Sequence, residues 1–134
     1  MNTTEKYGFR KPEANDFVSV DDLNHNADTM EKALCELDAE VNRLNHAVVL
    51  SVSKTGWSGG SAPYTQTVTV KGVTAEDRPV IGLSVSSGSN ADTIRAQSKA
   101  WGCVDRAVTG TDKITFYCYR KKPEVDFEVQ AKGV

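Results

Sequence analysis

Apolar residues recur between residues 20 and 48 at spacings that alternate between three and four positions. This pattern is an unbroken heptad repeat, whose first and fourth positions, a and d, form the contact seam of a coiled coil. The a positions hold Val20, Ala27, Leu34, Val41 and Val48, and the d positions hold Leu23, Met30, Leu37 and Leu44. The repeat predicts a helix over residues 20–47, with Ser19 and Asp22 as a capping pair at its start.

An amphipathic helix can pack along a sheet of its own chain or associate with copies of itself. Helices on a globular core usually carry a third apolar position in each heptad, whereas only Ala33 and Ala47 widen this stripe. We therefore expect a parallel coiled coil and keep packing on the chain's own sheet as the alternative. The mixed residues at a and d leave the number of helices open.

From Val48 onward the apolar period changes to two, which is typical of strands with one buried face. Five runs alternate in this way, and their expected inward residues are Val48, Leu50, Val52; Tyr64, Gln66, Val68, Val70; Ile81, Leu83, Val85; Ile114, Phe116, Cys118; and Val125, Phe127, Val129, Ala131. The predicted fold class is α+β, with an N-terminal coiled-coil helix followed by an antiparallel β-sandwich. Its expected parts are an arm over residues 1–18, a helix over 19–47 and a β-domain over 48–134.

Residues 90–101 interrupt the strand pattern and predict a short helix, capped by Asn90 and ended by Gly102, that packs Trp101 onto the sheet edge. A strand over residues 103–108 then meets one over 113–119. A two-residue loop at Gly110-Thr111 would place Cys103 opposite Cys118, whereas a three-residue loop would place Val104 there. The second register keeps the apolar residues on one face, so we expect free thiols.

Composition and charge narrow the classes of function. The 134 residues carry a net charge of −2, and residues 1–47 hold 5 of the 16 Lys and Arg but 10 of the 18 Asp and Glu. No basic stripe suits a phosphate backbone, and no apolar run reaches the roughly 18 residues of a membrane span, so we expect neither nucleic-acid binding nor membrane insertion. Three cysteines and no recognisable signal sequence are typical of a chain made in a reducing cytoplasm.

Candidate catalytic chemistry is sparse. Both histidines, His25 and His46, fall at heptad position f, where we expect them to be solvated, and residues 48–134 contain no histidine. This excludes a histidine-based triad or metal site within the β-domain, unless a neighbouring subunit supplies the imidazole. We expect no enzymatic activity, no metal and no cofactor. The remaining ligand candidates are Trp57 and Tyr64, which flank a loop of small residues and could either stack on a sugar or plug the end of the sandwich.

The segment over residues 7–28, which reads YGFRKPEANDFVSVDDLNHNAD, resembles the opening of tail-fibre and baseplate receptor-binding subunits of phages and prophages of Gram-positive bacteria. In that family a tyrosine-glycine and lysine-proline arm leads into a coiled coil. The motifs around Trp57-Ser58, Ala62-Pro63, Gly72-Val73, Ala100-Trp101 and Tyr117-Cys118 are similar to small β-domains that follow such openings in Firmicutes prophages.

The resemblance implies a homotrimer in the virion tail, assembled in the host bacterial cytoplasm. It implies that residues 1–18 anchor the chain to other tail or baseplate proteins and that the parallel helices project three β-domains outward. Our hypothesis is that these domains contact host cell-wall carbohydrate. We expect the arm to be mobile or bound to a neighbouring protein, because it carries Gly8 and Pro12 and lacks periodicity. The alternatives are a tail enzyme that degrades cell-wall glycan and a tail assembly factor.

Overall fold

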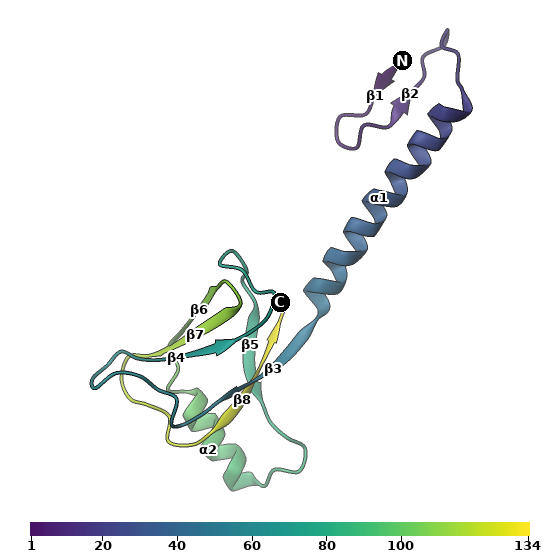
Figure 1. The fold of residues 1–134 in the computed structure, drawn as a ribbon. Coiled ribbons are helices and arrows are strands. Elements are labelled where there is room, and N and C mark those ends of the chain that lie inside the picture. The colour runs from purple at the N-terminus through teal and green to yellow at the C-terminus, as the bar shows by residue number, and fades with distance from the viewer. The chain divides into compact units, whose positions relative to one another are not determined.

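The computed structural model describes every residue from Met1 to Val134 and divides the chain into two compact units, Met1–Arg43 and Leu44–Val134. It contains two α-helices and three sheets, all of whose strand pairs are antiparallel (Figure 1). The mixed α+β class expected from the sequence is therefore confirmed. Neither helix combines the length and the apolar content that a membrane crossing requires.

The first unit consists of a short hairpin and most of a long helix. Strands β1 (Asn2–Thr3) and β2 (Arg10–Lys11) form the hairpin, and α1 covers Val20–Asn45. The Ser19 hydroxyl accepts a hydrogen bond from the Asp22 amide at 3.3 Å, and the Asp22 carboxylate accepts one from the Ser19 amide at 3.0 Å. This reciprocal pair satisfies two helix-start donors, so the predicted cap and the predicted first residue are confirmed.

The second unit contains two three-stranded sheets and one helix. The sheets have the strand orders β3-β8-β5 and β4-β7-β6, so β8 and β7 are the central strands (Figure 1). The elements are β3 (Ala47–Val52), β4 (Tyr64–Thr69), β5 (Val80–Ser84), α2 (Ala91–Trp101), β6 (Arg106–Gly110), β7 (Lys113–Cys118) and β8 (Phe127–Lys132). Because Ala47 already belongs to β3, the first helix ends two residues before its predicted end.

The buried side chains of both three-stranded sheets form one core. Ile114, Phe116 and Cys118 of β7 are fully buried, and so are Val129 and Ala131 of β8. These are inward positions of the predicted period-two pattern, which is thus confirmed for the two central strands. The predicted pattern runs past three strands, because Val70 follows β4, Val85 follows β5 and Val125 precedes β8. Of these three residues only Val85 is exposed.

Helix α2 begins and ends as predicted but packs differently. The Asn90 side chain accepts a hydrogen bond from the Thr93 amide at 2.8 Å, and Gly102 follows the last residue of the helix. The Trp101 ring lies 6.4 Å from the ring of Phe116 and 6.1 Å from that of Phe127, between ring centroids. These partners lie on the central strands β7 and β8, so Trp101 joins the shared core and does not pack onto a sheet edge.

The hairpin of β6 and β7 has neither of the two predicted registers. Gly110 pairs with Lys113, so the loop is Thr111-Asp112, and Asp112 adopts a left-handed backbone with φ of 56°. The segment before β5 holds this turn: the Asp112 amide donates to the Val73 carbonyl at 2.8 Å, and the Asp112 carboxylate accepts from the Gly72 amide at 2.8 Å. The shift turns Val108 to the outer face, opposite Thr115.

The shifted register also moves the cysteines. Amides of Cys103 and Val104 bond to the carbonyls of Ala100 and Trp101, so both residues continue the turn after α2, and β6 starts only at Arg106. Cys103 and Cys118 are buried free thiols and Cys35 is an exposed one, in agreement with the expectation of no bridge. Burial is the main cause that raises the pKa of Cys118 to about 11.

The position of Phe116 makes it the most direct test of the shared core. Replacing Phe116 by Ala should lower the free energy of unfolding by roughly 3–5 kcal/mol, because a fully buried ring is lost from the contact with Trp101. Urea unfolding at a fixed protein concentration measures this loss. The control is Val49→Ala on β3, which removes a side chain that is 56% exposed and should cost less than about 1 kcal/mol. Equal losses in the two variants would contradict a core at Phe116.

Candidate functional site

The a and d side chains of α1 are exposed along the whole helix. The helix has no buried residue, and Ala27 is exposed as well. The larger side chains are exposed by 70% at Val20, 62% at Leu23, 52% at Met30, 58% at Leu34, 60% at Leu37, 45% at Val41 and 52% at Leu44. The ninth predicted position, Val48, does not belong to this set, because it lies in β3, pairs with Ala131 and is half-buried.

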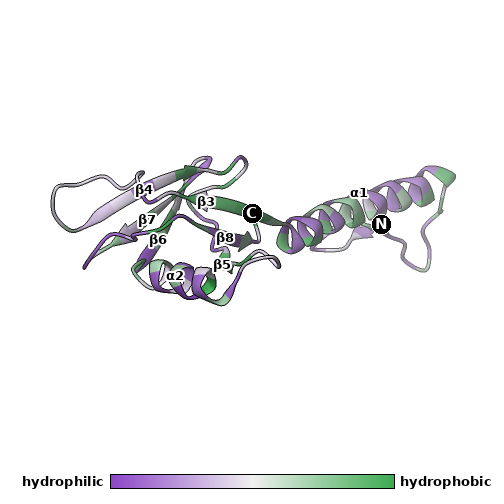
Figure 2. Cartoon of the chain, turned by 90° about the horizontal axis from the view of Figure 1, so that it is seen from below, coloured by the Kyte–Doolittle hydropathy of each residue, from purple (hydrophilic) through white to green (hydrophobic).

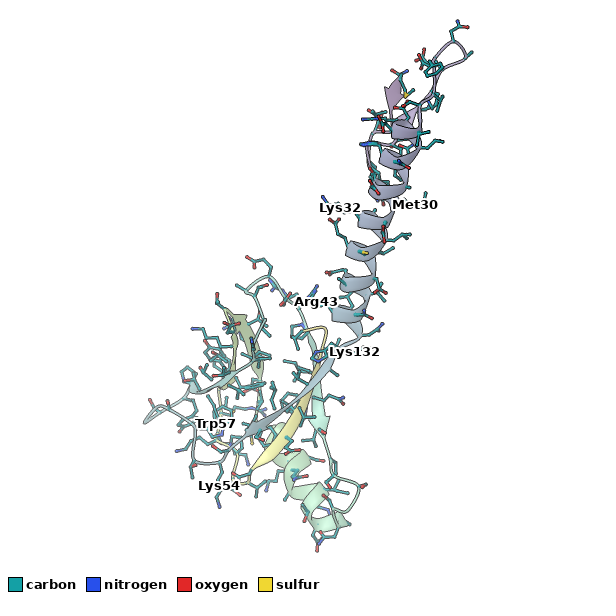
Figure 3. The ribbon with its side chains drawn as sticks, turned by 45° about the vertical axis from the view of Figure 1, so that its right-hand side comes forward. Met30, Lys32, Arg43, Lys54, Trp57 and Lys132 are labelled. Atoms are coloured by element: carbon teal, nitrogen blue, oxygen red, sulfur yellow. The ribbon has the colours of Figure 1, made fainter.

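The exposed stripe occupies one side of the helix. Figure 2 shows apolar residues recurring along α1 among polar ones, and Figure 3 shows Met30, at position d, and Lys32, at position f, on opposite sides of the helix. A continuous row of exposed large apolar side chains marks an interaction surface, since monomeric proteins rarely leave such rows in water. We call the residues from Val20 to Leu44 at positions a and d the heptad stripe.

The N-terminal arm does not hang free of α1. The Asn26 side chain pairs with both backbone groups of Arg10: its oxygen accepts from the Arg10 amide at 2.6 Å, and its nitrogen donates to the Arg10 carbonyl at 2.9 Å. The Arg10 guanidinium also forms an ion pair with Asp22 at 2.9 Å. The arm was expected to be mobile or bound to a neighbour, but it is bound to its own helix, because one amide side chain can replace a strand partner.

This docking changes the environment of His25. Its Nε2 lies 3.2 Å from the Gly8 carbonyl oxygen, and the residue is half-buried under the arm. The expectation of a solvated His25 is therefore wrong, because the arm covers its position. His46 follows the helix and is exposed, with Nδ1 3.0 Å from the Val134 carbonyl oxygen.

The arm covers one flank of α1 and leaves the heptad stripe open. Its contacts on the helix are Asp22 at position c, His25 at f and Asn26 at g. None of these is an a or d position. The interactions that fold the first unit are thus polar and lie on the g and c side, while the apolar side has no partner within the helix or the arm.

The carboxylate under the arm is held in its ionised form. Hydrogen bonds from the backbone and hydroxyl of Ser19, together with the Arg10 guanidinium, lower the pKa of Asp22 below its ordinary value. A carboxylate whose pKa is lower in the folded state stabilises that state above its unfolded pKa, and the contribution disappears as the pH falls through the lowered value. The cap and the arm contact therefore weaken together in acid.

The two ligand candidates from the sequence do not form a stacking surface. Trp57 is only 8% exposed and belongs to the core, which favours the alternative that it plugs the domain. Tyr64 is half-buried in β4, and the Lys122 ammonium group lies 5.3 Å from the centre of its ring. The indole of Trp57 is therefore unavailable to a sugar in this conformation.

A cleft that the sequence pattern did not indicate lies beside Trp101. It has a volume of about 610 Å³, and its lining includes Trp101, Arg78, Asp105 and Arg106. Two of its walls are joined by a hydrogen bond: the hydroxyl of Thr109, in β6, donates to the carbonyl of Asp77, in the loop before β5, at 3.0 Å. No periodicity could reveal this cleft, since its walls meet only after the loop before β5 closes onto β6.

Two charged residues of the cleft, Asp105 and Arg106, already have partners. A hydrogen bond from the Tyr119 amide and the Arg120 guanidinium, 3.1 Å away, lower the pKa of Asp105. The Arg106 guanidinium lies 5.1 Å from the centre of the Tyr117 ring and donates to the Tyr119 hydroxyl at 3.1 Å. No group of three or more His, Cys, Asp or Glu side chains in the chain is arranged to hold a metal ion.

The heptad stripe is therefore the surface that defines the class of this chain: an α+β protein with an unpartnered amphipathic helix. Comparisons with protein-family models, with curated proteins and with solved structures gave no match.

Replacement of Asn26 tests the arm contact. Asn26→Ala removes both hydrogen bonds to Arg10, so amide hydrogen exchange over residues 2–11 should accelerate by roughly 5- to 150-fold, as expected for the loss of two hydrogen bonds. The matched control is Asn42→Ala, whose side chain contacts only Asp38, at 3.4 Å. If both variants exchange at the rate of the unaltered protein, the arm is held by other contacts.

Proposed function

We propose that this chain is a non-enzymatic structural and adhesion subunit of a phage tail fibre or baseplate, which forms a homotrimer through a parallel coiled coil of α1. The observation that carries the proposal is the uninterrupted exposure of the heptad stripe. The resemblance of residues 7–28 to tail-subunit openings supports the tail assignment, and the anchoring arm would bind other tail or baseplate proteins. The shared core of the two three-stranded sheets supports a β-sandwich for the presented domain.

The charges beside the heptad stripe favour parallel helices in register. In that arrangement each g position faces the e position five residues later on the next helix. Each such pair then contains at most one acid: Asn26 with Glu31, Ala33 with Asp38, and Glu40 with Asn45. Antiparallel helices would bring e flank against e flank, so that Glu31 and Asp38 would lie against the same acids of the partner.

The carbohydrate part of the proposal fits the cleft beside Trp101 better than it fits Trp57. A volume of about 610 Å³ suits a small saccharide, and the half-buried indole lies among arginine and aspartate side chains that can bond to hydroxyl groups. Three linked copies would raise a weak affinity for a repeating cell-wall glycan by roughly a hundredfold or more. The lowered pKa of Asp105 suits the nucleophile or base of a glycan-cleaving pair but not its general acid, because the acid must retain its proton.

Disulfide trapping tests the orientation of the helices. In a Cys35→Ser background, Met30→Cys places one thiol at a d position, so parallel helices in register bring equivalent thiols together and oxidation should give covalent dimers. Lys32→Cys is the control, since its thiol lies on the opposite side of the helix (Figure 3). Denaturing electrophoresis separates the products. Equal cross-linking of the two variants, or none in either, would contradict the parallel arrangement.

The tail assignment is tested on purified particles of the phage or prophage that encodes the chain. Mass spectrometry should find the chain in the particles in multiples of three copies, and isolated protein should bind host cell walls without releasing reducing sugar. Absence from finished particles would favour the assembly factor. Release of reducing sugar that is lost on replacement of Asp105 would favour the enzyme.

A further inference from the structure

The position of the arm on α1 has a consequence for any parallel assembly of this helix. The arm lies on the g and c flank, through Asn26 and Asp22. In a parallel coiled coil, the g and c flank of one helix borders the e and b flank of the next. A bound arm therefore lies beside the neighbouring helix, and in an assembly in register it lies at the level of the same helical turns.

All the charged residues on the e and b flank of α1 are acidic. This flank carries no Lys or Arg, and its four charged residues are Asp21, Asp28, Glu31 and Asp38. All four are exposed, and none forms an ion pair with a cation of its own chain. If the neighbouring helix brings only neutral residues to this flank, its negative charges stay uncompensated. Close approach of several copies then raises the electrostatic energy of the assembly.

The arm carries the complementary charge. Lys11 directly follows Arg10, the residue that Asn26 holds, so its backbone position is fixed relative to the helix. Its side chain is exposed and has no ion-pair partner within the chain. Lys6, at the turn of the hairpin, is differently placed, because its ammonium group lies 5.0 Å from the centre of the Tyr7 ring. Lys11 is thus the cation that remains available beside the g and c flank.

We infer that the arm is an intersubunit clasp, in which Lys11 of one chain pairs with Asp28 and Glu31 on the e and b flank of a second copy. The inference rests on the proposed self-association of α1. It adds a contact between the arm of one chain and the helix of its neighbour in each groove between helices. Asn26 is central to the arrangement: it holds the arm on its own helix, and as a g residue it faces Glu31 of the neighbour. The apolar seam supplies the affinity, and the clasp selects parallel helices in register.

The size of the effect follows from the symmetry. An exposed ion pair contributes a factor of about 1.4 to 5 to an equilibrium constant, and a trimer repeats the pair in each of its grooves. Lys11→Glu should therefore raise the dissociation constant of the assembly by roughly 3- to 150-fold, and the difference should shrink as the salt concentration rises.

Cross-linking detects the contact directly. A water-soluble carbodiimide joins an amine to a carboxylate only when the two are in contact, and a mixture of ¹⁴N and ¹⁵N protein, unfolded and refolded together, distinguishes links between chains from links within one. The expected product is a mixed-mass peptide pair that joins Lys11 to Asp28 or Glu31. An oligomer that yields only same-mass pairs, or none at these residues, overturns the clasp and leaves the coiled coil intact.

A charge exchange completes the test. Lys11→Glu and Glu31→Lys should each weaken assembly in sedimentation experiments, and the double variant should regain most of the lost association, because the pair is restored with its signs reversed. Lys32→Glu makes the same charge change at an outer f position and should have little effect. Equal weakening by Lys11→Glu and Lys32→Glu, or no recovery in the double variant, would overturn the clasp. A monomeric unaltered protein would overturn the proposed function together with it.

Discussion

The proposed assembly depends on one interaction, the burial of the heptad stripe between copies of α1. Seven large apolar side chains of α1 are between 45% and 70% exposed in the single chain, and the arm binds the helix without covering any of them. Helices in proteins owe most of their stability to packing of an apolar face. The absence of a buried residue in α1 thus supports the proposed self-association, since a second copy offers the same repeat at the same spacing.

Polar and apolar side chains have different roles within the first unit. The capping pair of Ser19 and Asp22 fixes where the helix starts, and Asn26 with Arg10 fixes where the arm lies. Hydrogen bonds of this kind are directional, so they specify a geometry, whereas the apolar stripe supplies a driving force with little direction of its own. The proposed clasp joins the two, since it uses the fixed arm to choose among the arrangements that the stripe alone permits.

The sequence predicted the features that depend on local periodicity. The start of α1, the cap of α2 and the buried faces of β7 and β8 all follow from spacing and side-chain type. It did not predict features decided by distant contacts. The β6–β7 register depends on the bonds of Asp112 to the segment at residues 72–73, and the environment of His25 depends on an arm held by Asn26. The cleft beside Trp101 likewise exists only after two separate segments meet. The burial of Trp57, in contrast, was one of the two alternatives that the sequence offered.

The most direct test of the central claim is the absolute mass of the full chain in solution, measured by light scattering on a size-exclusion column over a range of concentrations. We expect a mass of three chains for the unaltered protein, and of one chain when Leu34→Asp and Leu37→Asp place carboxylates in the seam. A single chain of 14.6 kDa for the unaltered protein at every concentration would contradict the account.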